Sequence, residues 1–585
     1  MRTPAALRRL RVPQVVATIV AAVVLAGCGA PQPPHLTMVP TRGGTAVVAV
    51  VGGPAGCRPD GPFGQDAATA AVDAVVLPSA FTVSPTGQWV LNQSLFTQVE
   101  LINTAPQMIV YTLNSRAVWQ DGRPVSVADL TANWHRGVID SSALTPAYRL
   151  ITSIVASPDG HDATVTFAHP YSDWRALFSS MLPARIVEER HLSCSVVTPA
   201  VDLSAGPYAI SEASSSRVVL VRNPRWWGAR PMLDRLVIKI APSAATAIGW
   251  VTHNQAQVAT VDDFTAPEIA AIQGASAVSS TVGQTTRMLQ LVFDLHHGIA
   301  QSVGVRSEVA ESLTPKLLGV SIVGYVSHDF GNGRSLLGPR LVTSTVGVDL
   351  VNDGLPPIPT TTTTSSTTTT TPSNATTTTT TSPIPGYRLT PLGWRSPSGA
   401  KLRLRIGVSD ATPWSATIRR TLSTQLEAAG FGVTIVRYRT QLAVATAIVQ
   451  GRIDAGVLTR TATLSQSSAE RWFSLPSGRR WTVENPGGYD NPAVDADFLA
   501  AQEYLNPVDA AGAYTAIGKQ LSIDVPAVEL VTIPTVQLWR TALNNVFRFP
   551  FATSVTQAAP QWTISIPVPT TTKTPPTLPA PATAR

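Results

Sequence analysis

Cysteine is the residue type whose positions in this sequence point most directly to chemistry. Cys28 ends a Leu-Ala-Gly-Cys run that follows an apolar stretch from Val15 to Leu25, and four arginines precede that stretch. This order of basic, apolar and small residues is typical of a secretory signal, and a cysteine at the cut is the acceptor for a diacylglycerol group. An uncleaved membrane anchor is disfavoured, because an apolar stretch of 11 residues falls short of the roughly 20 that span a bilayer. We therefore expect a lipoprotein signal peptide over 1–27, lipidation of Cys28, a tether over 28–40 and a location on the extracytoplasmic face of the cell membrane.

The other two cysteines, Cys57 and Cys194, form one remaining pair if Cys28 is acylated. Outside the cytoplasm such a pair favours a disulfide. The alternative of two unpaired buried thiols stays open, because a sequence does not show whether two cysteines come within bonding distance.

Catalytic and metal-binding patterns are weak. His296 and His297 are adjacent, and neighbours on a strand point to opposite faces, so one metal site would not easily use both. The sequence contains no spaced Cys/His set, no His-Glu-x-x-His motif and no Gly-x-Ser-x-Gly elbow. The glycines at 331 and 333 favour a turn, and residues 512–519 depart from phosphate-loop spacing. We expect a binding protein with no catalytic residue, no metal and no cofactor.

The charge balance argues against nucleic acid as a partner. The formal net charge is +7 over 585 residues, and removing the four arginines of the signal leaves +3, which is too weak to indicate nucleic-acid binding. Charged residues make up only 14% of the chain, well below the usual quarter.

Alternating strand and helix patterns predict an α/β fold. Helices are expected over 66–76, 127–136 and 303–318, with Ser126 as N-cap and Asp129 completing a capping-box-like pattern. Strands are expected over 45–51, 108–113, 163–167, 217–221, 236–240 and 288–293. Residues 402–438 predict a strand–helix–strand unit in which Gly430 ends the helix, and its crossover should be right-handed.

Two segments have no apolar face to bury. Residues 356–385 are rich in threonine and proline, and a similar tail closes the chain from 567 to 585. Both are predicted to be disordered.

Several segments resemble the family 5 extracellular solute-binding proteins, the receptors of peptide and nickel ABC importers. Each segment alone is a weak signal, but their ordered set is fairly specific and spans about 42–540. In chain order they are 42–45 (RGGT), 111–130 (YTLNSRAVWQDGRPVSVADL), 205–208 (AGPY), 222–228 (RNPRWWG), 451–454 (GRID), 488–495 (GYDNPAVD) and 524–526 (DVP).

A narrower set of segments is similar to the LpqW-type lipoproteins of mycobacteria. These proteins keep the binding-protein fold but are associated with mannosylated phosphatidylinositol and lipoarabinomannan assembly. The segments are 75–81 (VVLPSAF), 150–154 (LITSI), 165–175 (VTFAHPYSDWR) and 182–187 (LPARIV).

The resemblance implies a two-lobed periplasmic-binding-protein-like fold (type II, cluster C) with an extra subdomain and a disordered Thr-rich insertion. Lobe I would comprise 41–80, 201–290 and 525–566, and the extra subdomain 81–200. Lobe II would comprise 291–355 and 386–524, separated by the insertion at 356–385.

One departure from the family bears on the ligand. In the family's peptide receptors, an acid shortly after the "G.D" strand pairs with the peptide ammonium, whereas here residues 456–462 read GVLTRTA, with Arg460 and no acid. A guanidinium suits a phosphate or carboxylate rather than an ammonium. Alternatively, Arg460 points to solvent or pairs with an acid such as Glu470. The candidate ligand-binding residues are Ser79, Phe81, Trp89, Thr459, Arg460 and Trp472.

These observations predict non-covalent capture of a small solute, peptide or glycolipid between two lobes. The first interpretation is a monomeric, lipid-anchored receptor that delivers a peptide- or oligosaccharide-like solute to an ABC permease. The alternative is an LpqW-like cell-envelope factor that binds a mannosylated phosphatidylinositol glycolipid or a partner in lipoarabinomannan assembly.

Overall fold

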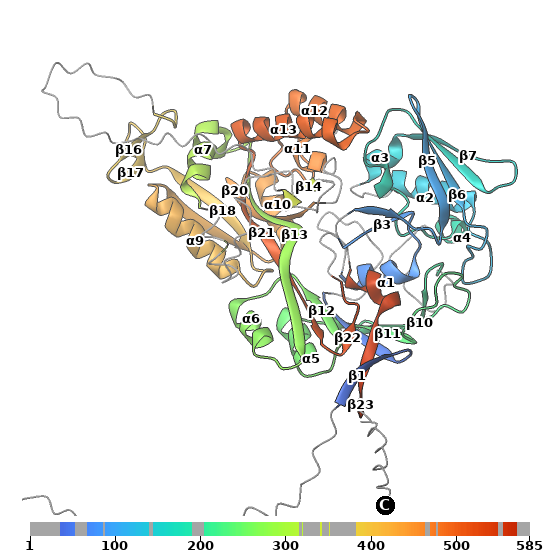
Figure 1. Ribbon diagram of the computed structural model, residues 1–585. Helices are drawn as coiled ribbons and strands as arrows, with labels where there is room; N and C mark the ends of the chain where they lie inside the picture. Colours follow the sequence, from blue (N-terminus) through green and yellow to red (C-terminus); the bar gives the residue numbers. More distant parts are fainter. Residues whose placement is uncertain are drawn as a thin grey trace, which may run out of the picture. The chain divides into compact units, whose positions relative to one another are not determined.

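The described part of the chain divides into two compact units. The computed structural model (Figure 1) describes residues 36–52, 67–85, 88–139, 144–189, 204–314, 319, 340–341, 350–351, 382–462, 469–475, 478–547 and 554–569. One unit contains residues 36–40 and 565–569, and the other contains the described residues between 41 and 564.

A ten-stranded mixed sheet forms the framework of the larger unit. Its central strands β13 and β21 pair antiparallel from Val278–Arg540 to Val292–Ala527, and Figure 1 shows them side by side. Strand β20 pairs with the second half of β13, while β12 pairs with the second half of β21. The order across the sheet is β19 (Gly432–Tyr438), β18 (Arg403–Ser409), β20 (Ala455–Thr461), β13 (Val278–Phe293), β21 (Ala527–Arg540), β12 (Val258–Val261), β2 (Thr45–Val51), β11 (Arg235–Ala241), β10 (Arg217–Arg222) and β9 (Tyr208–Ala213).

The register between β13 and β21 breaks near the middle of the pair. Gln284 lies opposite Pro534 and Met288 lies opposite Thr532, so the intervening segments of the two strands differ in length. Proline has no N–H to donate to a ladder, which makes this a natural place for a bulge. A second shift follows at once, because Gln290 pairs with Glu529 rather than with residue 530. This extra residue places the side chains of Thr532 and Glu529 on the same face of the sheet.

A separate four-stranded antiparallel sheet lies between residues 96 and 167, in the order β5 (Phe96–Thr104), β6 (Gln107–Leu113), β8 (Asp162–Phe167) and β7 (Ile151–Ala156). Helix α2 (Val127–Ile139) packs near it, and Asp129 organises the start of this helix. The Asp129 carboxylate accepts hydrogen bonds from the Ser126 backbone N–H, the Trp119 indole N–H and the Ala184 backbone N–H. The 117–130 segment therefore has a structural role.

Helices flank the two sheets, and short strands complete the architecture. The other helices are α1 (Ala67–Val76), α3 (Thr145–Arg149), α4 (Ala184–Glu189), α5 (Ala244–Thr252), α6 (Ala266–Gln273), α7 (Val303–Ser312), α9 (Ser415–Ala428), α10 (Gln441–Val449), α11 (Glu470–Phe473), α12 (Pro492–Glu503) and α13 (Pro507–Asp524), with 3-10 turns η1 (Trp174–Ala176), η2 (Ile299–Gln301) and η4 (Val555–Gln561). The other strands are β1 (Leu36–Thr41), β3 (Phe81–Val83), β4 (Trp89–Leu91), β14 (Arg340–Leu341), β15 (Leu350–Val351), β16 (Arg388–Thr390), β17 (Gly393–Arg395), β22 (Leu543–Asn544) and β23 (Thr563–Pro569).

Most of the predicted elements are confirmed to within a few residues. The unit formed by β18, α9 and β19 has parallel strands, and Gly430 follows the helix with a φ of 91°, as a helix-ending glycine requires. Helix α7 ends at Ser312, earlier than the predicted residue 318. No helix of the described residues is long and apolar enough to cross a membrane. The predicted insertion lies outside the described residues except for 382–385, and the lobe boundaries stay a prediction.

Candidate functional site

Arg460 is the centre of a buried polar cluster next to the register break. It lies on β20 opposite Met288 of β13 and is only 6% exposed. Its Nη1 donates a hydrogen bond to Oε1 of Gln290 at 3.0 Å, and its Nη2 donates to the backbone oxygen of Glu484 at 3.3 Å. Both acceptors are neutral, so Arg460 neither points to solvent nor pairs with Glu470.

Two aromatic rings cover the same guanidinium. The Cζ atom of Arg460 lies 5.3 Å from the ring centroids of both Trp472 and Phe473, which are consecutive residues of the short helix α11. Cation–π contacts of this kind strengthen when the cation is desolvated. The structure therefore brings together two of the predicted site residues, Arg460 and Trp472.

The charge of Arg460 has no direct counter-ion among the residues that the structure describes. Burial, together with the nearby Arg471 guanidinium, lowers the pKa of Arg460 to about 9, while Glu484 acts in the opposite direction. None of the ion pairs in the described part of the chain includes Arg460; the Glu484 carboxylate instead pairs with Arg471, at 3.6 Å between Nη1 and Oε1. Because a buried charge is costly unless it is paired, this arrangement needs a functional explanation.

A second buried ionisable side chain lies on the same face of the sheet. Glu529 of β21 is opposite Gln290, and its Oε1 accepts a hydrogen bond from the Thr532 hydroxyl at 2.8 Å. Burial raises the pKa of the Glu529 carboxyl to about 7, and none of the ion pairs among the described residues includes it. Sequence analysis missed Glu529 and Gln290; the one available signal was a charged residue inside the apolar run 527–540.

This cluster has the chemistry of a recognition site. Guanidinium, amide and carboxylate groups are planar, and they donate or accept hydrogen bonds in fixed directions. Trp472 and Phe473, which are 2% and 1% exposed, add an apolar side to the cluster.

Thr459, the neighbour of Arg460, serves a different purpose. Its backbone N–H and its hydroxyl each form a hydrogen bond of 2.7 Å with the side-chain amide of Gln441, at the start of α10. Successive residues of a strand point to opposite faces, so Thr459 and Arg460 do not present their side chains to the same face of β20.

The other three predicted residues gather around the β3–β4 hairpin. The Ser79 hydroxyl accepts a hydrogen bond from the Ser180 backbone N–H, and Phe81 packs edge-on against Trp174 with ring centroids 5.5 Å apart. Trp89 is half-buried against the same apolar core. Among the described residues, no hydrogen bond, ion pair or ring contact joins this group directly to Arg460 or Trp472, so their common role in binding stays a prediction.

An indirect connection runs through the end of α12. The backbone N–H of Ser172 donates to the backbone oxygen of Gln502 at 2.7 Å, and His169 lies 3.7 Å from the Glu503 carboxylate. The Gln502 side chain in turn donates to Oε2 of Glu470, the first residue of α11. These contacts connect the 81–200 segment to the helix that covers Arg460.

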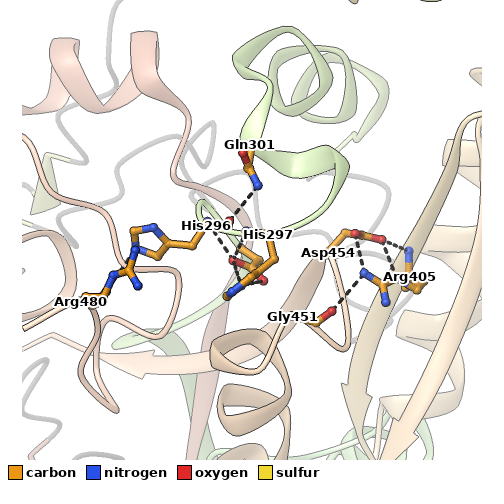
Figure 2. A network of polar contacts seen from close by, with 8 residues as sticks. His296, His297, Gln301, Arg405, Gly451, Asp454 and Arg480 are labelled. Carbon is orange, nitrogen blue, oxygen red and sulfur yellow. Dashed lines mark hydrogen bonds and ion pairs between the residues drawn. The ribbon is translucent and has the colours of Figure 1, made fainter.

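His296 and His297 do not form a metal site with a third ligand, since the described residues contain no group of three metal-ligating side chains. The two residues follow the end of β13 rather than lying on a strand. Figure 2 shows that the His296 ring lies beside Arg480, whose backbone oxygen is 3.2 Å from Nε2. The His297 ring instead contacts the buried Asp294 carboxylate, at 3.0 Å between Nδ1 and Oδ2.

The same network ties β18 to β20 (Figure 2). The Arg405 guanidinium donates to both carboxylate oxygens of Asp454 and to the backbone oxygen of Gly451. We interpret this network as structural support for the strand ends. The three cysteines, Cys28, Cys57 and Cys194, lie outside the described residues.

Comparison with known proteins finds a family model that matches part of the chain. The family model described as bacterial extracellular solute-binding proteins, family 5 Middle, matches residues 95–307. This middle part of the chain is similar to the family 5 solute-binding proteins. The framework of the chain is like that of solved two-lobed type II binding proteins, which confirms the predicted fold class.

Two relatives illustrate the relationship in sequence. The oligopeptide-binding protein OppA of Mycobacterium tuberculosis is 35% identical over 214 residues, which are 34% of this chain and 36% of that protein. This chain therefore spans about a third of that relative. The probable monoacyl phosphatidylinositol tetramannoside-binding protein LpqW of Mycobacterium tuberculosis is 27% identical over 553 residues, covering 88% of this chain and 84% of LpqW.

Solved structures extend the likeness in fold. The periplasmic EDTA-binding protein EppA superimposes with a TM-score of 0.74 at 18% identity, covering 90% of this chain and 97% of EppA. The oligopeptide-binding protein AppA of Bacillus subtilis, in complex with a nonapeptide, gives a TM-score of 0.63 at 12% identity and covers 90% of this chain and all of AppA.

Proposed function

We propose that this chain is a lipid-anchored, extracytoplasmic receptor that captures a solute without covalent chemistry and delivers it to an ABC permease. The family-model match over 95–307 and the two-lobed fold of the solved structures that resemble this chain support a binding role. The central strands β13 and β21 are suited to act as a hinge, because their register breaks where the two halves of the ten-stranded sheet meet.

The observation that carries the ligand assignment is the buried Arg460. Its guanidinium is held by Gln290, the Glu484 backbone and two aromatic rings, with no carboxylate in contact among the described residues. A ligand with a carboxylate, phosphate or dense set of hydroxyls would provide the missing acceptors. We therefore propose an anionic or polyhydroxylated ligand, in place of a peptide held by its ammonium group.

A second candidate function follows from the relative that covers most of the chain. The LpqW match spans 88% of this sequence, whereas the OppA match spans 34%. An LpqW-like envelope factor would bind a mannosylated phosphatidylinositol headgroup, which is both anionic and polyhydroxylated. Both candidates place the same chemistry on Arg460, and they differ in whether the captured molecule is imported.

Native mass spectrometry of the mature protein, purified from its own host, tests this proposal. The expected result is a bound species that carries phosphate, carboxylate or sugar groups and is released on unfolding. A glycolipid mass supports the envelope role, and a water-soluble solute supports import. Retention of ordinary short peptides that also bind an Arg460→Ala variant equally well would contradict the ligand assignment.

A further inference from the structure

The two ends of the described chain form a small apolar ribbon. Strands β1 and β23 are neighbours in one sheet, and residues 36–40 and 565–569 form a compact unit of their own. We call these two segments the terminal ribbon. Four of its ten residues are large apolar residues with exposed side chains, and their exposed fractions are 52% for Met38, 41% for Val39, 47% for Ile566 and 39% for Val568.

The terminal ribbon also lacks charge. Its sequences are LTMVP and SIPVP, without a single Lys, Arg, Asp or Glu. Exposed strand edges in soluble proteins are normally protected by charged side chains, because uncharged apolar edges promote association. This surface therefore has the composition of one that is covered in its working environment.

Apolar side chains lie on both faces of the terminal ribbon. Met38 and Val39 are consecutive residues of a strand, so they point in opposite directions. A protein partner or a second copy of the chain would cover one face and leave the other in water. The interfacial layer of a bilayer surrounds an inserted side chain on all sides. Its polar headgroups can also form hydrogen bonds with the backbone N–H and C=O groups at the strand edges, which would find no partner in the hydrocarbon core.

Chain length places the terminal ribbon close to a membrane. Only residues 29–35 separate Cys28 from Leu36. Eight residue steps span at most about 25–29 Å when fully extended, which is less than the thickness of a bilayer. Lipidation of Cys28, on which this step depends, would therefore hold the ribbon within reach of the headgroups.

We propose that the terminal ribbon docks on the outer surface of the lipid bilayer, with Met38, Val39, Ile566 and Val568 entering the interfacial layer. The ribbon gives the receptor a second membrane contact beside its acyl anchor. Each apolar side chain that enters the interface would add to the membrane affinity that the acyl chains of the anchor supply. Because the ribbon is uncharged, its contribution should not depend on anionic lipid.

The test uses the mature chain starting at residue 29, which cannot be acylated, so its outcome is independent of lipidation. Flotation with phosphatidylcholine vesicles is expected to show measurable co-flotation of the wild type. The double variant Met38→Asp/Ile566→Asp should lower the partition coefficient by about tenfold or more, since each change removes an apolar group from the interface. The matched control is Leu392→Asp, because Leu392 is 73% exposed in the larger unit; it should leave partition unchanged.

Three further measurements keep the result decisive. Thermal unfolding must give the same midpoint for all variants, and hydrogen exchange with vesicles should protect peptides covering 36–41 and 563–569 more than any other exposed segment. Sedimentation without lipid tests the alternative that a second copy of the chain, rather than a membrane, covers the terminal ribbon. No co-flotation of the wild type, an equal loss in the Leu392 control, or a dimer that the double variant dissociates would each overturn the proposal.

Discussion

Arg460 and Gln290 lie on neighbouring strands and share one hydrogen bond, from Nη1 to Oε1 at 3.0 Å. This contact pairs a buried cation with a neutral amide, although an ionised partner would stabilise it more. Glu529 lies on the next strand, directly opposite Gln290, and is not in ionic contact with Arg460. The sheet thus holds a buried guanidinium and a buried carboxyl whose pKa is raised by burial, separated by an amide.

The first prediction separates a binding role of Arg460 from a structural one. Replacing Arg460 with Met removes a buried charge that pairs with no carboxylate of the described residues, and it keeps most of the apolar stem. The stability of the ligand-free protein should therefore be unchanged or higher. Binding of the co-purified species should weaken by about 1.5–3 kcal/mol, the range for a lost hydrogen bond to a charged group. Urea unfolding and calorimetric titration measure the two effects.

The control for this experiment is Arg437→Met, because Arg437 has a side chain that is 67% exposed and pairs with Asp410. It should change neither binding nor stability by more than about 1 kcal/mol. A destabilisation above about 2 kcal/mol in Arg460→Met with unchanged binding would mean that Arg460 is structural.

The second prediction concerns the pH dependence of stability at Glu529. Burial raises the pKa of its carboxyl from 4.5 to about 7 in the folded state, so the folded protein binds the proton more tightly than the unfolded chain does. The neutral carboxyl therefore makes its full contribution to the free energy of unfolding below pH 4.5, and this contribution is lost as the pH rises through 7. The loss amounts to about 3 kcal/mol, at 1.36 kcal/mol for each pKa unit.

Unfolding free energies of wild type and Glu529→Gln, measured from pH 4.5 to 8, test this dependence. The amide cannot ionise, so the variant should gain stability relative to the wild type as the pH rises through this range. The exposed Glu212, which pairs with Arg217 at the surface, provides the control Glu212→Gln. Parallel pH profiles for wild type and Glu529→Gln would show that the buried carboxyl does not titrate in this way.

Local sequence patterns were sufficient to predict the strands and helices of the framework, but not the contacts of the cluster around Arg460. The strand–helix–strand unit at 403–438 could be predicted because its apolar periodicity and Gly430 are both local signals. Arg460 was singled out only because it departs from a family pattern. Its acceptors come from β13 and from the loop at Glu484, and nothing in the spacing of these residues predicts their contact.

Glu529 shows why register matters more than composition here. Its burial and its position opposite Gln290 depend on the second shift between β13 and β21. A one-residue change of register would turn the side chain to the other face. Such a shift is not encoded in the alternation of apolar and polar residues.

The third prediction is lipidation at Cys28. The basic and apolar segments of the signal precede a small-residue cleavage site, so the mature wild-type protein should enter the detergent phase in a phase-separation assay. Cys28→Ala should remain in the aqueous phase or accumulate as an uncleaved precursor of higher mass. Detergent partition of a processed Cys28→Ala protein equal to that of the wild type would refute the anchor.

The fourth prediction is a disulfide between Cys57 and Cys194, the pair left after acylation of Cys28. Such a bond would close a long loop and stabilise the protein by roughly 3–5 kcal/mol in the chain-entropy model. Thiol titration of the secreted, denatured chain should detect no free thiol before reduction and two after it. Two thiols before reduction would exclude the bond.

The fifth prediction concerns Gln502, which connects the 81–200 segment to α11. Its side chain donates to Oε2 of Glu470, whose pKa is raised chiefly by burial. Gln502→Ala removes this donor and leaves a buried carboxylate oxygen short of a partner, so stability should fall by about 1–3 kcal/mol. Glu503→Gln is the matched control on the same helix turn, because its partner His169 is 63% exposed and surface pairs contribute little.

The position of Gln502 adds a consequence for binding. The Ser172 backbone N–H donates to the Gln502 backbone oxygen, and this bond does not depend on the side chain. Gln502→Ala should therefore leave that bond in place while loosening α11, which carries Trp472 and Phe473 over Arg460. Hydrogen exchange is expected to increase in peptides covering 469–475 and to stay unchanged at 169–173. Equal increases in hydrogen exchange in both segments would show that the Gln502 side chain supports the contact between α12 and the 81–200 segment as well as α11.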